Sequence, residues 1–149
     1  MRVVVQRVTE ASVTIDRETI STINEGLLLL IGITHNDGEN EIDRITRKIV
    51  TLRIFDDEKG VMNRSVQDIG GSILAVSQFT LYGNCKKGNR PSYIDAAPGA
   101  VSEPLYDTFC DRLEQLLPDK IQRGRFGADM KVHLLNNGPV TILLDSNNL

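Results

Sequence analysis

The hydroxyl side chains of Ser77 and Thr80, in the segment SQFT, are the first candidates for nucleophilic chemistry in this sequence. A hydroxyl becomes an effective nucleophile when a neighbouring base accepts its proton. The sequence has no GxSxG elbow, no Walker loop and no HExxH motif. Neither His35 nor His133 lies in a motif that would activate a hydroxyl. The residues alone therefore favour a structural role for Ser77 and Thr80.

A metal centre has equally little support from residue types and spacing. The two histidines stand in different contexts, and the two cysteines, Cys85 and Cys110, form no CxxC motif. A zinc site would therefore need carboxylate ligands that no motif identifies. The residues alone therefore disfavour a structural metal.

Basic residues on two glycine-containing loops give a stronger signal. Lys86, Lys87 and Arg90 follow the best predicted strand, and Arg123 and Arg125 lie in RGRFG. The net charge is −3, so no global basic field points to nucleic acid, and any such partner must be bound by local patches. Two readings remain open, phosphate or RNA contact and an ordinary solvated loop.

The elements that must position these residues begin with β-strands. The β-branched segment Val3–Ile15 and the segment Glu18–Ile23 predict a hairpin that turns at Asp16 and Arg17. The apolar run Gly26–Ile33 is far shorter than the roughly 20 residues of a membrane span. It is typical of a strand buried on both faces.

Two helices are predicted from apolar stripes at helical spacing. Asp37 is the expected N-cap of the first helix, and Ser102 that of the second, with Pro104 in the first turn. The two stripes are Ile42, Ile45, Ile49 and Leu52, and Leu105, Phe109, Leu113 and Leu116.

The segment Ser72–Tyr82, introduced by Gly70 and Gly71, is the clearest predicted strand. Alternation along it would place Ser77 and Phe79 on the face opposite Gln78 and Thr80. The order strand, helix, strand therefore occurs twice. This order predicts a mixed sheet with right-handed crossovers and two helices on one face.

Composition and length set the remaining bounds. The chain has 149 residues with 40% hydrophobic and 25% charged residues, which suits one globular domain over residues 1–149. The N-terminal segment alternates like a strand and lacks the layout of a signal peptide. With no sign of export, we expect a reducing, cytoplasmic location.

Gly138 and Pro139 interrupt the two C-terminal apolar runs, MKVHLL and VTILLD. Proline cannot donate a backbone hydrogen bond and is normally excluded from the middle of a sheet. The break is either an ordinary turn between strands or a segment whose backbone has a function.

Motifs along nearly the whole chain resemble the D-aminoacyl-tRNA deacylase family. Two of them carry the resemblance, SQFTLYG at residues 77–83 and NNGPVT at residues 136–141. The sequence departs from the family pattern at Asn137, where an acidic residue is expected, and at Asn84 and Cys85, where Asp-Thr is typical. The other motifs, in order, are VVQRV, ASV, GLLLLIGI, LRIF, MNRS, GGSILAVSQFTLYG, GNRPSY, AAP and FGADMKV.

The resemblance implies a single α/β domain with a mixed, largely antiparallel, barrel-like sheet and two main helices on one face. It implies hydrolysis of the ester joining a D-amino acid, or mischarged glycine, to the 3′ end of tRNA. It also implies a homodimer with both active sites at the subunit interface and no metal, cofactor, DNA or membrane partner. Each site would combine the SQFT segment of one subunit with the Gly-Pro segment of the other.

The resemblance further implies a cis bond between Gly138 and Pro139, which turns both carbonyls into the partner's pocket. Rigid carbonyls there would accept hydrogen bonds from the substrate amino group and exclude an L side chain. Glycine has no side chain to exclude. Arg7 is expected to support these carbonyls from behind, and Met130 to line the same pocket.

The catalytic segment implied by the resemblance is Ser77, Gln78, Phe79 and Thr80. Its backbone N–H groups would stabilise the oxyanion, while the terminal ribose 2′-OH helps to activate water. Thr80 as a covalent nucleophile is the alternative. The terminal adenosine is expected near Phe79 and Tyr82.

Lys86, Lys87 and Arg90 are expected to contact tRNA phosphates. Two rival functions remain open. One is a non-catalytic dimer that binds tRNA or nucleotide ends. The other is a serine-type esterase for small molecules, which the lack of a triad disfavours.

Overall fold

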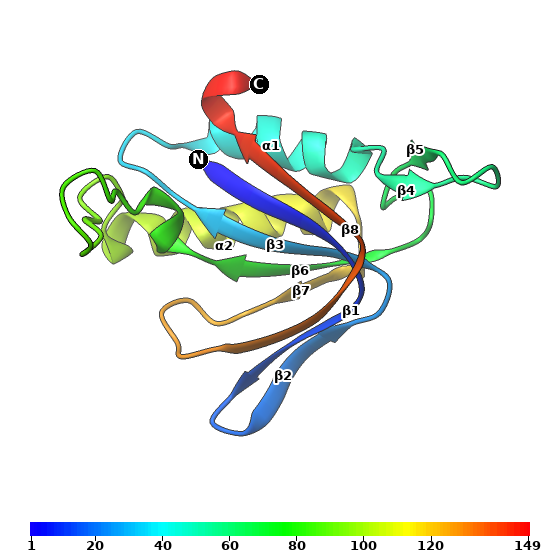
Figure 1. The fold of residues 1–149 in the computed structure, drawn as a ribbon, viewed down its shortest axis with the longest axis horizontal. Helices are drawn as coiled ribbons and strands as arrows, with labels where there is room; N and C mark the ends of the chain where they lie inside the picture. Colours follow the sequence, from blue (N-terminus) through cyan, green and yellow to red (C-terminus); the bar gives the residue numbers. More distant parts are fainter.

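The computed structural model describes all residues, 1–149, as one α/β unit (Figure 1). It has eight strands, two α-helices and two short 3₁₀ helices. In chain order these are β1 (Arg2–Ile15), β2 (Glu18–Ile23), β3 (Gly26–Gly32), α1 (Glu39–Thr51), β4 (Phe55–Asp56), β5 (Met62–Arg64), β6 (Ser72–Ser77), η1 (Phe79–Tyr82), α2 (Gly99–Leu116), β7 (Ile121–Arg123), β8 (Lys131–Asp145) and η2 (Ser146–Asn148).

The main sheet has the order β2-β1-β3-β6-β7, and β8 also pairs with β1. Strand β1 is antiparallel to β2, β3 and β8, whereas β6 is parallel to both β3 and β7. The long strands β1 and β8 bend together, so the sheet curls into a nearly closed barrel (Figure 1). The predicted fold class, a mixed and largely antiparallel barrel-like sheet, is confirmed.

The hairpin β1–β2 turns where the sequence predicts, because Asp16 and Arg17 both adopt positive φ, 48° and 67°. Such backbone angles match the twist of a two-residue hairpin turn. The two predicted crossovers are also present, since α1 connects β3 to β6 and α2 connects β6 to β7. Each of these strand pairs is parallel.

Both helices pack on one face of the sheet, as predicted. The core there joins alternate residues of β3, such as Leu27 and Leu29, to apolar residues of α1 and α2, such as Ile45 and Phe109. The intervening residue Leu28 belongs to a second core, inside the curled sheet. Strand β3 is therefore buried on both faces, which explains its continuous apolar run.

The helix starts differ from the prediction. Helix α1 begins after Gly38, whose N–H donates to the Glu41 carboxylate (2.9 Å). Asp37 does not cap the helix. Its carboxylate accepts bonds from the Met1 ammonium (2.6 Å) and the Thr34 N–H (2.7 Å).

Helix α2 begins at Gly99, directly after Pro98, so Ser102 is not its N-cap. The Ser102 hydroxyl instead donates to the Pro98 carbonyl (3.1 Å). Pro104 consequently lies beyond the first turn. Neither helix is long and apolar enough to cross a membrane.

The predicted strand 72–82 is wrong beyond Ser77. The Gln78 N–H donates to the Ile31 carbonyl of β3 (2.7 Å), and the chain then turns into η1. The Gly83 N–H closes this turn on the Thr80 carbonyl (2.9 Å). The alternation that would place Phe79 with Ser77, and Gln78 with Thr80, therefore does not apply.

Candidate active site

A cavity of about 360 Å³ opens where β6 ends. Ser77, Gln78 and Phe79 line one side of it, and the loop before β8, including Met130, lines the other. The structure thus brings Met130 to the SQF segment, whereas Thr80 is not part of the lining. The remaining lining residues are Val76, Phe126, Gly127, Ala128, Asp129 and Val132.

The cavity offers main chain and apolar surface but no base that could activate a hydroxyl. Its only titratable lining residue is Asp129, whose carboxylate pairs with Lys131 Nζ (3.1 Å). The exposed Thr80 hydroxyl contacts the Gln78 side-chain amide. The arrangement can bind a group and polarise it through backbone dipoles, but it has no catalytic triad.

Phe126 and Ser102 also contribute to this region, although the sequence analysis did not identify either as a site residue. They line a smaller cavity beside the first, together with Ser77, Gln78 and Phe79. Ser102 comes from α2, well separated in sequence from the SQFT motif. Only the packing of α2 against the sheet brings the two together.

Gly138 and Pro139 lie in a bulge of β8. Strand β1 pairs Gln6 with Thr141 and Val8 with Asn136, so residues 137–140 of β8 lie opposite the single residue Arg7. The peptide between Gly138 and Pro139 is cis, as expected, and both residues are exposed. The two predicted C-terminal strands are thus one long strand with a bulge at its bend.

The bulge and the cavity lie in different parts of the molecule. The middle of β8 is on the right in Figure 1, whereas β6 ends and η1 begins on the left. Neither Gly138 nor Pro139 lines either cavity of the SQF segment. One chain therefore does not bring the two predicted halves of the site together.

The Arg7 side chain supports the bulge by a hydrogen bond. Its side chain is buried, with only 7% of the residue exposed. The guanidinium donates to the carbonyls of Asn137 and Ile54 (both 2.8 Å) and to the Asp56 carboxylate (3.3 Å). The predicted support is thus a hydrogen bond to the residue before Gly138, and not to the Gly138 or Pro139 carbonyl.

Glycine is required at position 138 for two reasons. Its φ is +125°, which L side chains rarely adopt, and a Cβ there would lie 2.7 Å from Arg7 Nη2. The shape of the bulge and the position of the Arg7 guanidinium therefore depend on each other.

Tyr82 is not available for stacking on a base, contrary to the prediction. It is buried, and the Arg2 guanidinium lies 4.6 Å from the centre of its ring. Burial raises the pKa of the Tyr82 hydroxyl to about 12. The aromatic neighbour of Phe79 is instead Tyr93, which the sequence did not single out because 3₁₀ helix η1 and a loop separate the two residues.

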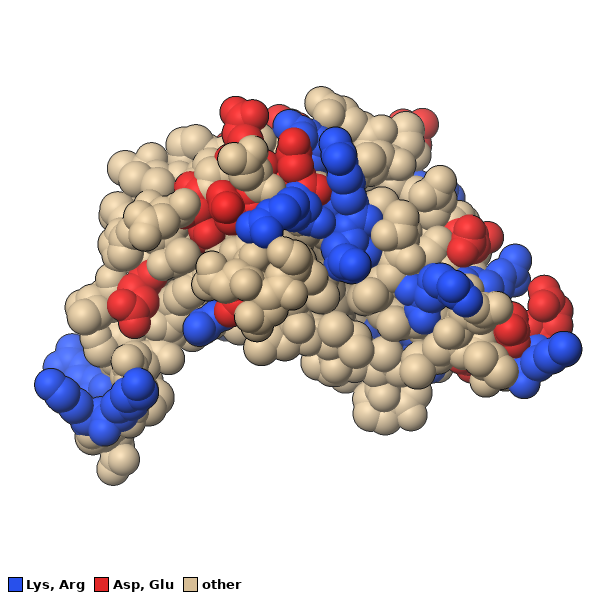
Figure 2. All heavy atoms as spheres, turned by 90° about the horizontal axis from the view of Figure 1, so that it is seen from above, with Lys and Arg blue, Asp and Glu red and all other residues tan.

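The three predicted phosphate-contacting cations lie together on an exposed loop. Main-chain bonds between Asn84 and Ser92 (2.8 and 2.9 Å) close the loop that carries Lys86, Lys87 and Arg90. Figure 2 shows basic side chains at the left end of the molecule, where Figure 1 places this loop. The loop follows η1 directly, so its cations lie close in sequence to the cavity lining.

In the second basic loop, one of the two cations is already paired. Arg123 pairs with the Asp111 carboxylate (2.5 Å), whereas Arg125 is exposed.

Neither histidine is placed for catalysis at the cavity. His35 Nε2 bonds to the Ile94 carbonyl (2.6 Å), and His133 faces Glu10 (3.4 Å). No group of three or more His, Cys, Asp or Glu side chains is arranged to hold a metal ion.

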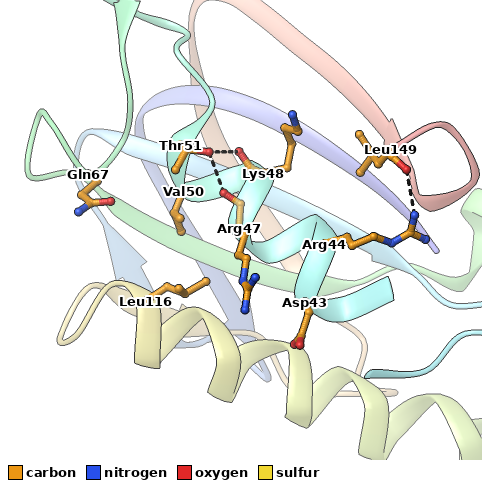
Figure 3. Close-up of a pocket in the computed structure, with 9 residues that line it drawn as sticks. All are labelled: Asp43, Arg44, Arg47, Lys48, Val50, Thr51, Gln67, Leu116 and Leu149. Atoms are coloured by element: carbon orange, nitrogen blue, oxygen red, sulfur yellow. Dashed lines mark hydrogen bonds between the residues drawn. The ribbon is translucent and has the colours of Figure 1, made fainter. Parts of the chain in front are cut away.

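A larger cavity, of about 660 Å³, lies between α1, α2 and the C-terminus (Figure 3). Its lining includes four charged residues, among them Arg44, which donates to the Leu149 carbonyl (2.9 Å), and Arg47, which points into the cavity. None of the predicted site residues lines it. We therefore place the candidate active site at the smaller cavity after β6.

Comparisons with known proteins identify the family. A family model described as D-Tyr-tRNA(Tyr) deacylase matches residues 4–145. A D-aminoacyl-tRNA deacylase from Bacteroides thetaiotaomicron is 57% identical over 148 residues, 99% of each chain. A solved structure described as c-Myc DNA Unwinding Element Binding Protein is 46% identical, with a TM-score of 0.93 over 97% of this chain and 98% of that one.

A probable eukaryotic D-amino acid tRNA deacylase shares the fold. Its TM-score is 0.81 at 17% identity, over 96% of this chain and 97% of that one. The family model and the relative from Bacteroides both extend over almost the whole length of the chain. The chain belongs to the D-Tyr-tRNA(Tyr) deacylase family.

Proposed function

We propose that this protein hydrolyses the ester between a D-amino acid and the 3′ end of tRNA, and that it also releases mischarged glycine. Family membership and the name of the 57% identical relative support the reaction class. The observation that carries the mechanism is a cavity lined by Ser77, Gln78, Phe79 and Met130 without a base to activate a hydroxyl. We infer that the protein acts in the cytoplasm, where tRNA is charged.

The chemistry needs little from the side chains, because an aminoacyl ester is already activated. Water adds to the ester carbonyl carbon, and the bond to the ribose 3′ oxygen breaks. That oxygen takes a proton, which gives a free amino acid and an intact tRNA end. The neighbouring ribose 2′-OH helps to activate the water, and a backbone N–H of the catalytic segment stabilises the oxyanion.

The Gln78 N–H is already bonded to the Ile31 carbonyl, so it is not the main oxyanion donor. We assign that role to the next N–H, that of Phe79. The Ser77 and Thr80 hydroxyls have no neighbouring base, which supports a mechanism without a covalent intermediate.

Selection of the D isomer requires a second copy of the chain in this proposal. The bulge with Gly138 and Pro139 is exposed and held by Arg7, and neither residue lines the cavity of its own chain. In a homodimer, the bulge of one subunit would enter the cavity of the other. Its carbonyls would accept bonds from the substrate amino group and occupy the space of an L side chain.

The loop with Lys86, Lys87 and Arg90 would contact phosphates of the tRNA acceptor end. Its position directly after η1 and its exposed cations support this role. Such contacts add affinity that does not depend on sequence and that falls as salt concentration rises.

The test is to incubate the protein with D-tyrosyl-tRNA, L-tyrosyl-tRNA and mischarged glycyl-tRNA and to follow amino acid release. We expect release from the first and third substrates only. Tight tRNA binding without release would instead support a non-catalytic binding protein. Competition by unlabelled duplex DNA tests a DNA-binding role, which the name of the 46% identical relative suggests for that protein; we expect duplex DNA to compete poorly.

A further inference from the structure

Phe79 and Tyr93 form an exposed aromatic pair at the entrance of the cavity. Their ring centres are 5.0 Å apart and the rings are inclined by 72°. Phe79 is 55% exposed and Tyr93 is 40% exposed, although large aromatic side chains are usually well buried. Phe79 also lines the cavity, so the pair continues its apolar surface outward.

The position of Tyr93 is fixed from both sides. A Cβ on Gly83 would lie 3.2 Å from Tyr93 Cε1, so the ring packs against the main chain that follows η1. On the other side, His35 Nε2 donates to the Ile94 carbonyl and Thr34 Oγ1 donates to the Asp95 carbonyl (both 2.6 Å). The pair is therefore a preformed surface and not a mobile loop tip.

The chain between the two aromatic residues carries the charges that RNA needs. Lys86, Lys87 and Arg90 are exposed on this loop, and residues 79–93 contain no carboxylate. The nearby carboxylates are those of Asp95 and of Asp129, which lines the cavity and pairs with Lys131. Unpaired nucleotides bind proteins by stacking their bases on aromatic rings while cations contact their phosphates. Exposed aromatic rings next to three cations match that chemistry better than they match an apolar protein surface.

We propose that Phe79 and Tyr93 bind the unpaired nucleotides that precede the terminal adenosine of the tRNA. This inference rests on the proposed function, because the terminal nucleotide carries the ester and must enter the cavity. The nucleotides before it then lie at the entrance, where the aromatic pair stands. Tyr93 is thus a substrate-positioning residue and contacts no reacting atom.

The test uses an RNA hairpin that carries no amino acid (uncharged in the sense of tRNA) and ends in a single-stranded 3′ overhang. The base before the terminal adenosine is 2-aminopurine. Stacking of 2-aminopurine on Phe79 or Tyr93 quenches the fluorescence of 2-aminopurine. We expect Tyr93→Phe to bind like the wild type and Tyr93→Leu, which keeps apolar bulk without a π face, to bind about tenfold more weakly. Ile94→Ser, at a neighbouring residue that is 78% exposed, is the matched control and should bind normally.

Wild-type affinity and quenching in Tyr93→Leu would overturn the proposal. A shift in sedimentation coefficient for Tyr93→Leu would also overturn it, because the pair would then be a contact between copies of the chain. In hydrolysis assays, Tyr93→Leu should raise KM and leave kcat unchanged. Because the hairpin is uncharged, its binding is measured whether or not the protein hydrolyses D-tyrosyl-tRNA, so failure of the two proposals can be distinguished.

Discussion

The segment after β6 and the bulge in β8 both interrupt a strand, yet they build opposite shapes. After Ser77, the chain turns into η1 and lines a cavity with Gln78 and Phe79. At Gly138 the chain bends outward and presents exposed main chain. The first region forms a cavity, whereas the second exposes main chain and lines neither cavity of the SQF segment.

The two regions are also held by different means. The cavity segment is fixed by main-chain bonds, from Gln78 to Ile31 and from Gly83 to Thr80. The bulge depends on one buried side chain, that of Arg7. Substitutions of side chains should therefore affect the bulge much more strongly than the cavity segment.

Arg7→Ala should have the largest effect, because it leaves the carbonyls of Ile54 and Asn137 without their donor. We expect the free energy of unfolding to fall by about 2–4 kcal/mol. Hydrolysis of D-tyrosyl-tRNA should fall about 100-fold, because the bulge loses its position. Urea unfolding and single-turnover assays measure the two effects, and Arg7→Lys should be intermediate. A stable, active Arg7→Ala variant would contradict the role given to this side chain.

Gly138→Ala should be the next most damaging change, since its Cβ would meet the Arg7 guanidinium. We expect hydrolysis to fall at least about tenfold, equivalent to ~1.4 kcal/mol in the barrier. Gly60→Ala is the matched control. Gly60 also has a positive φ, +75°, but a Cβ there would meet nothing within 4 Å. Equal activity loss in both variants would mean that backbone angle alone, and not the contact with Arg7, matters.

Replacing Lys86, Lys87 and Arg90 together by alanine tests the surroundings of the cavity. We expect tRNA binding to weaken and the negative slope of log K against log salt to become less steep by about 2–3, since each of the three phosphate contacts contributes roughly 0.7–0.9. The control is Arg47→Ala with Lys48→Ala on α1. These two residues line the larger cavity (Figure 3) and not the candidate active site. An unchanged slope in the triple variant would remove this loop from the RNA path.

Thr80→Ala should have the smallest effect, because the residue is exposed and its hydroxyl contacts the Gln78 side-chain amide, which is not a base. We expect kcat to stay within about threefold of the wild type, whereas loss of general acid–base catalysis typically costs 10²–10⁴-fold. Single-turnover rates on D-tyrosyl-tRNA measure this directly. If Thr80→Ala binds tRNA but does not turn over, the covalent alternative is supported and the proposed mechanism is wrong.

The sequence predicted the fold well where periodicity and turn residues are strong. Alternation along β1 and the apolar stripe of α1 matched the buried faces, and Asp16 and Arg17 marked the hairpin turn. The end of β6 was missed because the apolar residues of SQFTLY continue the strand pattern in the sequence. In the structure the strand ends at Ser77, and residues 79–82 form the 3₁₀ helix η1. The helix caps were missed because Asp37 and Ser102 found other partners in the fold.

The candidate site was predictable only in part. The resemblance indicated Met130 and the SQF segment as site residues, and both line the same cavity. No local pattern could show that Tyr93 and not Tyr82 lies beside Phe79. That distinction depends on how the loop after η1 folds back, which is a tertiary property.

The pairing of β1 with β8 has a consequence for synthesis of the protein. Strand β1 is synthesised before β8, so Arg7 is present in the growing chain well before the Asn137 carbonyl to which it donates. A growing chain therefore contains the cavity segment well before it contains the bulge. A product that stops short of β8 would lack the bulge and, under the proposed function, the means to discriminate between D- and L-aminoacyl esters.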